Sequence, residues 1–360
     1  MKPMHVVLTG GGTLGPVTPL IAVSRALKAL APGADVSWIG TKGGPEERIV
    51  REAGIPFSAI SAGKLRRYFS WRNLVDPLLV VQGFFEARRA LKAAKASVVV
   101  SAGGFVAVPV AWAARSLGIP VHVHQQDVRP GLANRLSLPA AASMSVALES
   151  SVADFPGRHP EWTGNPVRPE LAAGSREEAK RIFGLEDGVP VVLVLGGGTG
   201  AAGLNRLVRD ALPSLTERVQ LIHVAGPGKT DPSVVSPRYR QVELLTSELP
   251  HAFAAASLVV TRAGMGVLSE LSALGKPAII VPMPGSHQED NAAAFARASG
   301  ASSLDERETS PRELAGAILR FIDDPDRQAA VADGMRKANQ PDAADRIARI
   351  IIRTAGLRQG

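Results

Sequence analysis

Polar side chains in two neighbouring turns of the chain could together bind a sugar carried on a nucleoside diphosphate. The first turn follows a short apolar run, 258–260, and leads into a helical pattern that contains Glu270. The second follows another apolar run, 278–281, and contains Gln288 and Asn291. A carboxylate can accept hydrogen bonds from both hydroxyls of a ribose, and amide side chains suit sugar hydroxyls. The alternative is two ordinary turns marked by glycine and proline.

A parallel sheet would bring these turns to one edge. Apolar, strand-like runs alternate with helical runs, which is typical of parallel sheets with helices on both faces. Loops at the carboxyl ends of such strands line the ligand crevice, and a glycine-flanked helix N-terminus offers N–H groups to a diphosphate. The expected strands are 6–8, 36–39, 98–101, 121–123, 191–195, 221–224, 258–260 and 278–281.

The chain contains an imperfect internal repeat. Residues 6–13 (VVLTGGGT) and 191–199 (VVLVLGGGT) each read as a strand and a glycine-rich loop, followed by helices expected at 20–30 and 204–212. This pattern predicts an α/β protein with two doubly wound parallel-sheet domains that face one another across a cleft. We expect a first domain at 1–163, a linker at 164–169, a second domain at 170–340, and a C-terminal helix in 341–360 that could pack back on the first domain.

Composition excludes several classes of protein. The chain has 360 residues, which suits two domains, and 45% hydrophobic with 21% charged residues is typical of soluble globular proteins. Cysteine is absent, which excludes disulfides and thiolate metal sites. The N-terminus lacks the pattern of a signal peptide, so we expect a cytoplasmic protein. Residues 96–114 carry no charge, but glycine and proline interrupt them, which favours strand, turn and buried helix over a membrane span.

A literal GxGxxG at 10–15 raises the possibility of dinucleotide binding. Such a site also needs an acidic residue at the end of the second strand to bind the ribose. Here the second strand runs into GTK at 40–42, and Pro16 and Pro19 lie in the opening turn of the helix. The sequence therefore disfavours NAD or FAD.

Eight segments, in order along nearly the whole chain, resemble the MurG family. Its members are bacterial N-acetylglucosaminyltransferases that add the second sugar to the undecaprenyl-linked precursor of peptidoglycan. The segments are the glycine-rich first loop, GKLRRYFSWRNLVDP at 63–77, SAGGFVAVP at 101–109, HQQDVRPGLANRL at 124–136, GNPVR at 164–168, GGGTGAAGLN at 196–205, TRAGMGVLSEL at 261–271 and HQEDNA at 287–292. The resemblance implies a GT-B fold, UDP-N-acetylglucosamine as donor, inversion at the anomeric carbon, and no metal or other cofactor.

The resemblance also implies roles for individual residues of the second half. Glu270 would hold the uridine ribose, and Leu245 and Thr246 would border the uracil. The residues expected at the diphosphate are Arg168, Gly197, Gly198 and Thr199, and those expected at the donor sugar are Met265, Gln288 and Asn291. Arg168 and helix N-termini could stabilise the departing diphosphate without Mg²⁺. Arg262 could support the loop without touching ligand.

In the first half, the resemblance places His124 and Asp127 at the reacting centre. Either could be the general base, since a histidine titrates near neutral pH and an aspartate is ionised there. The alternatives are a structural histidine closing its strand and an aspartate capping a turn. The residues expected at the lipid-diphosphate acceptor are Gly12, Thr13, Leu14, Gly15, Gly104 and Asn134, the last of which could instead lie on a helix surface.

The chain departs from the family at three positions. Many members have a histidine in the first loop where this chain has Pro16, which can neither exchange a proton nor donate from its nitrogen. A serine often found in the second-half loop is Gly198 here, with Thr199 beside it. The acidic residue that often follows the histidine at 124 is Gln125.

The segment 64–72 interleaves four cations with aromatic rings and precedes an apolar stretch. Basic and aromatic residues together suit an anionic membrane surface. The alternatives are a core helix with a solvated basic edge and, third, nucleic-acid binding, which we do not expect. The residues expected at the membrane are Leu65, Arg66, Arg67, Phe69, Trp71 and Arg72.

The sequence thus predicts a peripheral enzyme at the cytoplasmic face of the cell membrane. It would transfer N-acetylglucosamine from UDP-N-acetylglucosamine to the 4-hydroxyl of undecaprenyl-diphosphate-linked N-acetylmuramyl-pentapeptide, forming lipid II. One rival is a transferase for another lipid-linked glycan. The other, motivated by Pro16, is a catalytically silent UDP-sugar-binding protein that takes part in assembly at the membrane.

Overall fold

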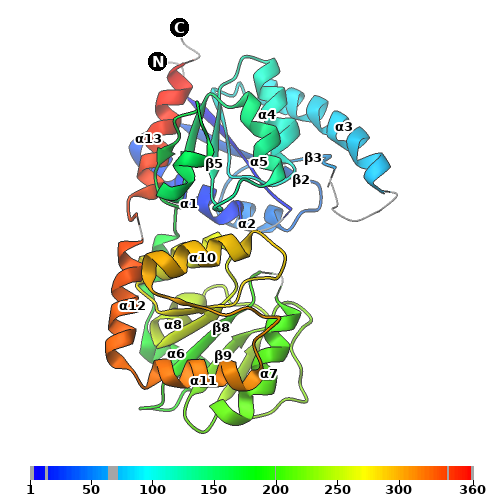
Figure 1. Cartoon of the computed structure of the whole chain (residues 1–360). Coiled ribbons are helices and arrows are strands. Elements are labelled where there is room, and N and C mark those ends of the chain that lie inside the picture. The colour runs from blue at the N-terminus through cyan, green and yellow to red at the C-terminus, as the bar shows by residue number, and fades with distance from the viewer. Residues whose placement is uncertain (1–3, 13–14, 64–71, 199, 339, 358–360) are drawn as a thin grey trace. The chain divides into compact units, whose positions relative to one another are not determined.

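The computed structural model describes residues 4–12, 15–63, 72–198, 200–338 and 340–357, with the backbone alone at 72–75. They form two compact units (Figure 1). Unit 1 is Met1–Val167 together with Pro341–Gly360, and unit 2 is Arg168–Gln340. Each unit is a parallel sheet covered by helices.

Unit 1 contains a seven-stranded sheet in the order β3-β2-β1-β4-β5-β6-β7. Because β1 pairs with both β2 and β4, the chain winds outward from β1 first to one side and then to the other. The strands are β1 (His5–Thr9), β2 (Asp35–Thr41), β3 (Phe57–Ile60), β4 (Val98–Ser101), β5 (Val121–Gln125), β6 (Ser143–Val146) and β7 (Glu161–Trp162). The central strands β1, β4 and β5 are almost wholly buried because helices cover both faces.

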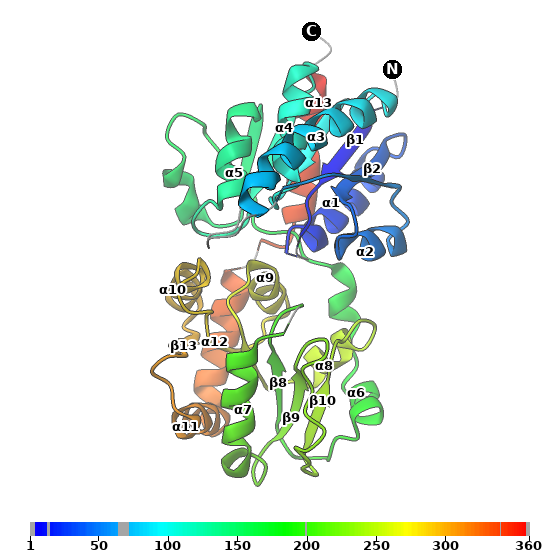
Figure 2. The same ribbon diagram turned by 90° about the vertical axis from the view of Figure 1, so that its right-hand side faces the viewer.

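The helices of unit 1 include the last one in the chain. They are α1 (Val17–Leu30), α2 (Glu46–Glu52), α3 (Arg72–Ala93), α4 (Ala107–Ser116), α5 (Leu132–Ser137) and α13 (Ala343–Gly356). Ile347 and Ile351 of α13 join the same buried cluster as Leu20 and Leu27 of α1, so the C-terminal helix completes the core of the unit. Helices α3 and α4 lie side by side over the other face (Figure 2).

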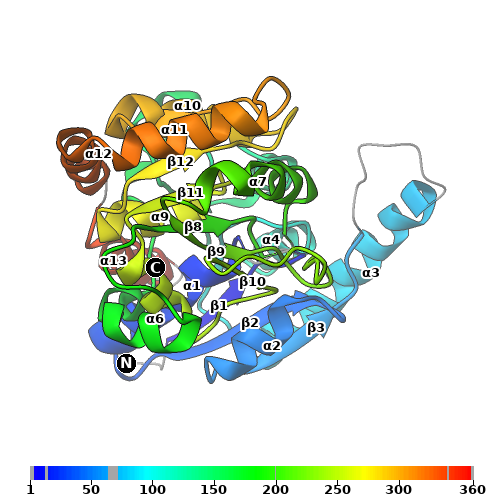
Figure 3. The ribbon, with the colours of Figure 1, turned by 90° about the horizontal axis from the view of Figure 1, so that it is seen from below.

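Unit 2 repeats this plan with six strands in the order β10-β9-β8-β11-β12-β13 (Figure 3). They are β8 (Val191–Leu195), β9 (Gln220–Val224), β10 (Tyr239–Val242), β11 (Leu258–Thr261), β12 (Ala278–Ile280) and β13 (Ser302–Ser303). The helices are α6 (Arg176–Phe183), α7 (Ala202–Leu215), α8 (Leu249–Ala255), α9 (Met265–Leu274), α10 (Gln288–Ser299), α11 (Pro311–Ile322) and α12 (Pro325–Lys337). Short 3₁₀ turns occupy Leu138–Ala140 and Glu149–Asp154 in unit 1, and Pro169–Ala173 in unit 2.

All eight strands expected from the sequence are present, and the common strand order confirms the internal repeat. Five strands, β3, β6, β7, β10 and β13, were not expected, because they are short or polar. Residues 96–114 form β4, a turn and the first part of α4, as expected. In the part of the chain that the structure describes, no helix is long and apolar enough to span a membrane.

Candidate active site

In unit 2, two loops flank the point where the strand order reverses, which is where open α/β sheets bind ligands. One loop, 196–201, joins β8 to α7, and the other, 262–264, joins β11 to α9. Gly197 and Gly198 are exposed, and their backbone N–H groups have no partner among the described residues. Gly200 has φ +71°, and a Cβ there would lie 2.1 Å from the carbonyl oxygen of Ala225, so only glycine fits. Thr199 lies outside the described residues.

Glu270 lies in α9, nearly buried, and forms an ion pair with Arg168. The arginine donates from Nε at 3.1 Å and from Nη2 at 2.7 Å, both to Oε1 of the carboxylate. Among the described residues, Oε2 of Glu270 has no hydrogen-bond partner. Burial raises the pKa of the Glu270 carboxyl above its ordinary value, and the charge of Arg168 opposes that rise. One carboxylate oxygen is thus held in place while the other remains available to a ligand.

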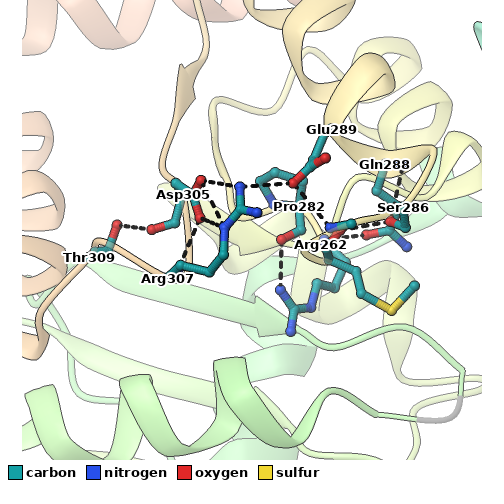
Figure 4. A network of polar contacts seen from close by, with 10 residues as sticks. Arg262, Pro282, Ser286, Gln288, Glu289, Asp305, Arg307 and Thr309 are labelled. Carbon is teal, nitrogen blue, oxygen red and sulfur yellow. Dashed lines mark hydrogen bonds and ion pairs between the residues drawn. The ribbon is translucent and has the colours of Figure 1, made fainter.

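Gln288 (Figure 4) and Asn291, at the start of α10, both bond to the loop that precedes α9. The side-chain oxygen of Gln288 accepts from the N–H groups of Ala263, at 3.2 Å, and of Met283, at 3.0 Å. The fully buried Asn291 donates from Nδ2 to the carbonyl oxygen of Ala263 at 3.1 Å. These bonds bring the two turns singled out in the sequence into direct contact. In the described structure the Nε2 group of Gln288 has no protein partner, which leaves two donors for a sugar hydroxyl.

Arg262 supports this loop through hydrogen bonds to backbone carbonyl groups (Figure 4). Its Nη1 donates to the carbonyl oxygens of Val281 and Pro282, both at 3.0 Å, and it forms an ion pair with Glu306. Nearby, Arg307 pairs with Asp305 at 2.6 Å and with Glu289 at 3.1 Å. The buried guanidinium of Arg262 is therefore used internally, in agreement with a supporting role.

The other described residues expected at the sugar donor lie at the same edge of the sheet, and they form no bond with Glu270, Gln288 or Asn291. Met265 is buried in the first turn of α9, and Leu245 is buried in the loop after β10. Thr246 beside it is exposed, and its N–H donates to the carboxylate of Glu248 at 3.1 Å.

Sequence reasoning missed a set of buried, hydrogen-bonded side chains and a lysine beside the loop 196–201. His223 bonds to Asn205 through Nε2, at 3.1 Å, and to the Tyr239 hydroxyl through Nδ1, at 2.7 Å. Burial lowers the pKa of His223 to about 4, so it is neutral and structural. Lys229 donates from Nζ to the carbonyl oxygen of Gly200 at 3.1 Å, which places its charge beside the glycine-rich loop.

In unit 1, the corresponding loops follow β1 and β4, and they touch. A Cβ added to Gly104, which has φ +87°, would lie 2.4 Å from the carbonyl oxygen of Gly11. Asn134 is buried against the same turn, with Oδ1 3.3 Å from the Cβ position of Gly103. Two of the residues expected at the acceptor, Gly104 and Asn134, thus lie beside the first loop at the switch point of this sheet. Gly12 is half-buried and Gly15 exposed, whereas Thr13 and Leu14 lie outside the described residues.

His124 is fully buried, and both of its ring nitrogens are bonded. Nδ1 lies 2.9 Å from the Ser145 hydroxyl and Nε2 lies 3.1 Å from Oδ1 of Asn165. His122 shares the Ser145 hydroxyl at 3.0 Å, which extends the chain of bonds along β5 and β6. Burial lowers the pKa of His124 to about 4, although the hydrogen bond that Nε2 donates to Oδ1 of Asn165 acts in the opposite direction. This geometry favours a positioning role for His124 over proton transfer.

Asp127 lies two residues beyond β5 in a turn that Gln125 organises. The Gln125 side chain donates to the carbonyl oxygens of Asp127, at 2.7 Å, and Arg129, at 3.2 Å, and accepts from Asn134 at 2.5 Å. An ionised glutamate could not donate these bonds, so the amide at 125 fixes the turn that carries Asp127. Asp127 is half-buried, unlike His124.

An apolar groove of about 290 Å³ lies between α3 and α4. It is lined by Val80, Val81, Phe84, Phe85, Val108, Pro109 and Trp112. Phe85 is 63% exposed and Leu78, earlier on α3, is 69% exposed. Of the residues expected at the membrane, Arg72 begins α3 but its side chain is not described, and Leu65, Arg66, Arg67, Phe69 and Trp71 lie outside the described residues.

Comparison with known proteins identifies the family. Residues 6–146 match the glycosyltransferase family 28 N-terminal domain, and residues 191–347 match its C-terminal domain. The UDP-N-acetylglucosamine–N-acetylmuramyl-(pentapeptide) pyrophosphoryl-undecaprenol N-acetylglucosamine transferase of Lachnoclostridium phytofermentans is 40% identical over 352 residues, which cover 96% of this chain and 98% of that protein. The chain belongs to the MurG family.

Solved structures agree with this membership of the MurG family. The crystal structure of MurG from Acinetobacter baumannii has a TM-score of 0.75 and 26% identity, and the match covers 98% of this chain and all of that one. The glycosyltransferase of kitacinnamycin has a TM-score of 0.77 with 15% identity, covering 99% of this chain and all of that one, and so shows the shared fold alone. The chain therefore has the GT-B fold expected of a MurG family member.

Proposed function

We propose that this chain transfers N-acetylglucosamine from UDP-N-acetylglucosamine to the 4-hydroxyl of N-acetylmuramyl-pentapeptide linked by a diphosphate to undecaprenol, which yields lipid II. The observation that carries the proposal is the donor constellation of unit 2, in a chain of the MurG family. Oε2 of Glu270 has no partner among the described residues and can accept from a ligand. Gln288 offers its Nε2 group as a donor, and its side-chain oxygen holds the loop before α9. A ribose and a hexosamine need these two kinds of group.

The transfer is a single displacement with inversion. The acceptor O4 forms a bond to the anomeric carbon of the donor, and the bond from that carbon to the diphosphate oxygen breaks. The electron pair of the broken bond leaves with UDP, and the proton of the acceptor hydroxyl passes to a base. The exposed N–H groups of Gly197 and Gly198 and the N-terminus of α7 would stabilise the departing charge without a metal.

We assign the base to Asp127. Its side chain is half-buried in a turn fixed by Gln125, whereas His124 is fully buried with both nitrogens bonded. A base must come within hydrogen-bonding distance of the hydroxyl that it deprotonates. His124 would act through Ser145 and Asn165 to hold the end of β5.

We further propose that the chain docks on the cytoplasmic face of the membrane through α3, α4 and the segment 64–72. Leu78, Phe85 and Trp112 expose apolar surface around the groove between the two helices. Such exposed apolar side chains beside a basic segment suit an anionic bilayer, which also holds the polyprenyl acceptor. Replacing Arg66, Arg67 and Arg72 by Gln should remove most binding to anionic vesicles at low salt, and equal sedimentation of the variant and the native protein would exclude this segment.

The deciding experiment measures lipid II formation from radiolabelled UDP-N-acetylglucosamine and the lipid-linked monosaccharide. We expect turnover with this donor, little with UDP-N-acetylgalactosamine, and loss of turnover in Glu270→Ala. A folded protein that binds UDP-N-acetylglucosamine but forms no product would favour a silent binding protein. Product formed only with a different lipid-linked acceptor would favour the other glycan transferase.

A further inference from the structure

A buried carboxylate lies beneath the first glycine-rich loop. Glu46, the first residue of α2, is 0% exposed. Its Oε1 accepts from the N–H of Thr41 at 2.6 Å, and its Oε2 accepts from the N–H of Gly12 at 3.2 Å. Within the described residues Glu46 forms no ion pair, so backbone N–H groups provide the contacts that stabilise its charge. A buried carboxylate held only in this way is costly and suggests a specific task.

Glycines make the space that the carboxylate occupies. A Cβ on Gly11 would lie 2.1 Å from Oε1 of Glu46, and a Cβ on Gly44 would lie 2.3 Å from Oε2. A Cβ on Gly40 would meet the Phe57 ring first, at 2.5 Å, and would lie 3.2 Å from Oε1 of Glu46. The ring nitrogen of Trp38 donates to the carbonyl oxygen of Gly10 at 3.1 Å and holds the same loop from another side. The first glycine-rich loop therefore packs closely against the Glu46 carboxylate.

From this carboxylate, close backbone contacts lead to the residues assigned to the acceptor. Glu46 holds Gly12, and Gly11 packs directly against Gly104 of the β4–α4 turn. The neighbouring Gly103 contacts Asn134, which is bonded to the Gln125 side chain. A shift of the first loop would be transmitted along these glycines because none has a side chain that could absorb it.

We propose that Glu46 is a positioning residue for the lipid-diphosphate acceptor. It accepts the N–H of Gly12 and thereby fixes the position of the loop against the β4–α4 turn. The N–H of Gly12 is thus satisfied inside the protein, and the acceptor meets a loop with a fixed shape. This inference rests on the proposed transferase function of the chain.

The test compares two independent ways of disturbing the contact. In Glu46→Gln, the amide oxygen should remain on Thr41, the shorter bond, and the NH₂ group would face the N–H of Gly12, which it cannot satisfy. In Gly11→Ala, the added methyl group displaces the carboxylate without removing it. Gly33→Ala is the matched control, because no atom lies within 4 Å of the added Cβ.

We expect both variants to raise the acceptor KM by about tenfold or more, with the Kd for UDP unchanged, since a charge-assisted hydrogen bond contributes about that factor. Lipid-linked monosaccharide in detergent serves as acceptor, and calorimetry with UDP counts the folded sites. An unchanged acceptor KM with a lower melting temperature would reduce Glu46 to a structural role, as would a parallel loss of UDP affinity. If Glu46→Gln does not fold, the acceptor KM of Gly11→Ala decides. Absence of turnover in the native chain would instead refute the transferase function itself.

Discussion

Removing the guanidinium of Arg168 tests how the donor site works. The family resemblance places Arg168 at the diphosphate, but in the structure it donates twice to Oε1 of Glu270. We therefore expect Arg168→Met to weaken donor binding through the ribose, because the arginine orients the carboxylate and opposes the rise in its pKa. Burial alone raises the pKa of Glu270, and the variant has no cation to oppose that rise.

The magnitude follows from the geometry. A hydrogen bond to a charged group contributes about 1.5–3 kcal/mol, or about 10- to 150-fold in Kd. The Arg168 side chain is 26% exposed, so solvent screens the pair and the lower end applies. We expect Kd to rise about tenfold at pH 8. Since a protonated Glu270 accepts poorly and the variant has no cation to oppose the rise in its pKa, the affinity of the variant should fall more than that of the native protein as the pH is lowered.

Calorimetry with uridine and with UDP distinguishes the two roles. If Arg168 acts through Glu270, the variant loses affinity for both ligands, and Arg168→Met adds nothing to Glu270→Gln in a double-mutant cycle. A variant that binds UDP weakly but uridine normally would refute this reasoning and would indicate that Arg168 contacts the diphosphate. The same conclusion would follow if the two substitutions were additive.

Three further predictions concern unit 1. Asp127→Asn should lower kcat by about 10²–10⁴-fold while the donor Kd and the melting temperature stay unchanged. His124→Ala should lower the melting temperature as well as kcat, because it leaves buried polar groups without partners. If Asp127→Asn keeps the native kcat, the base is another residue. Replacing Leu78 and Phe85 by Ser should reduce sedimentation with anionic vesicles without affecting transfer to a short-chain, detergent-soluble acceptor, and undiminished sedimentation would exclude this face. Burial lowers the pKa values of His122 and His124 to about 3 and about 4, so below pH 6.5 the unfolded chain takes up protons that the folded chain does not. Unit 1 should therefore become less stable as the pH falls from 6.5 towards about 4. Melting curves at pH 7 and pH 5 measure this loss, which His122→Gln should reduce.

The fold was predictable where burial leaves a clear pattern. Runs such as 191–195 are apolar throughout because helices cover both faces of the sheet, and they were recognised as strands. Strand β6, with the sequence SMSV, was missed because two of its four residues are serines. Ser143 and Ser145 face the buried histidines of β5 and bond to them, so their polarity reflects a partner that is distant in the sequence.

The candidate site was predictable as a set of residues but not as a set of bonds. Glu270, Gln288 and Asn291 were recognised by their types and positions after strands. That Arg168 would bond to Glu270, 102 residues away, depends on tertiary geometry. The same limit explains Glu46: an acidic residue was sought directly after β2, whereas the carboxylate reaches back from the next helix.

The two units share one strand order, but the backbone N–H groups of their glycine-rich loops are used differently. Both place a Gly-Gly-Gly-Thr loop after the first strand of a sheet with the same order. In unit 1 the N–H of Gly12 donates to the Glu46 carboxyl group, so this N–H is bonded within the protein. In unit 2 the N–H groups of Gly197 and Gly198 have no partner among the described residues, and Lys229 adds a positive charge beside the loop. The second loop therefore offers N–H groups and a nearby cation that suit the nucleoside diphosphate of the proposed donor.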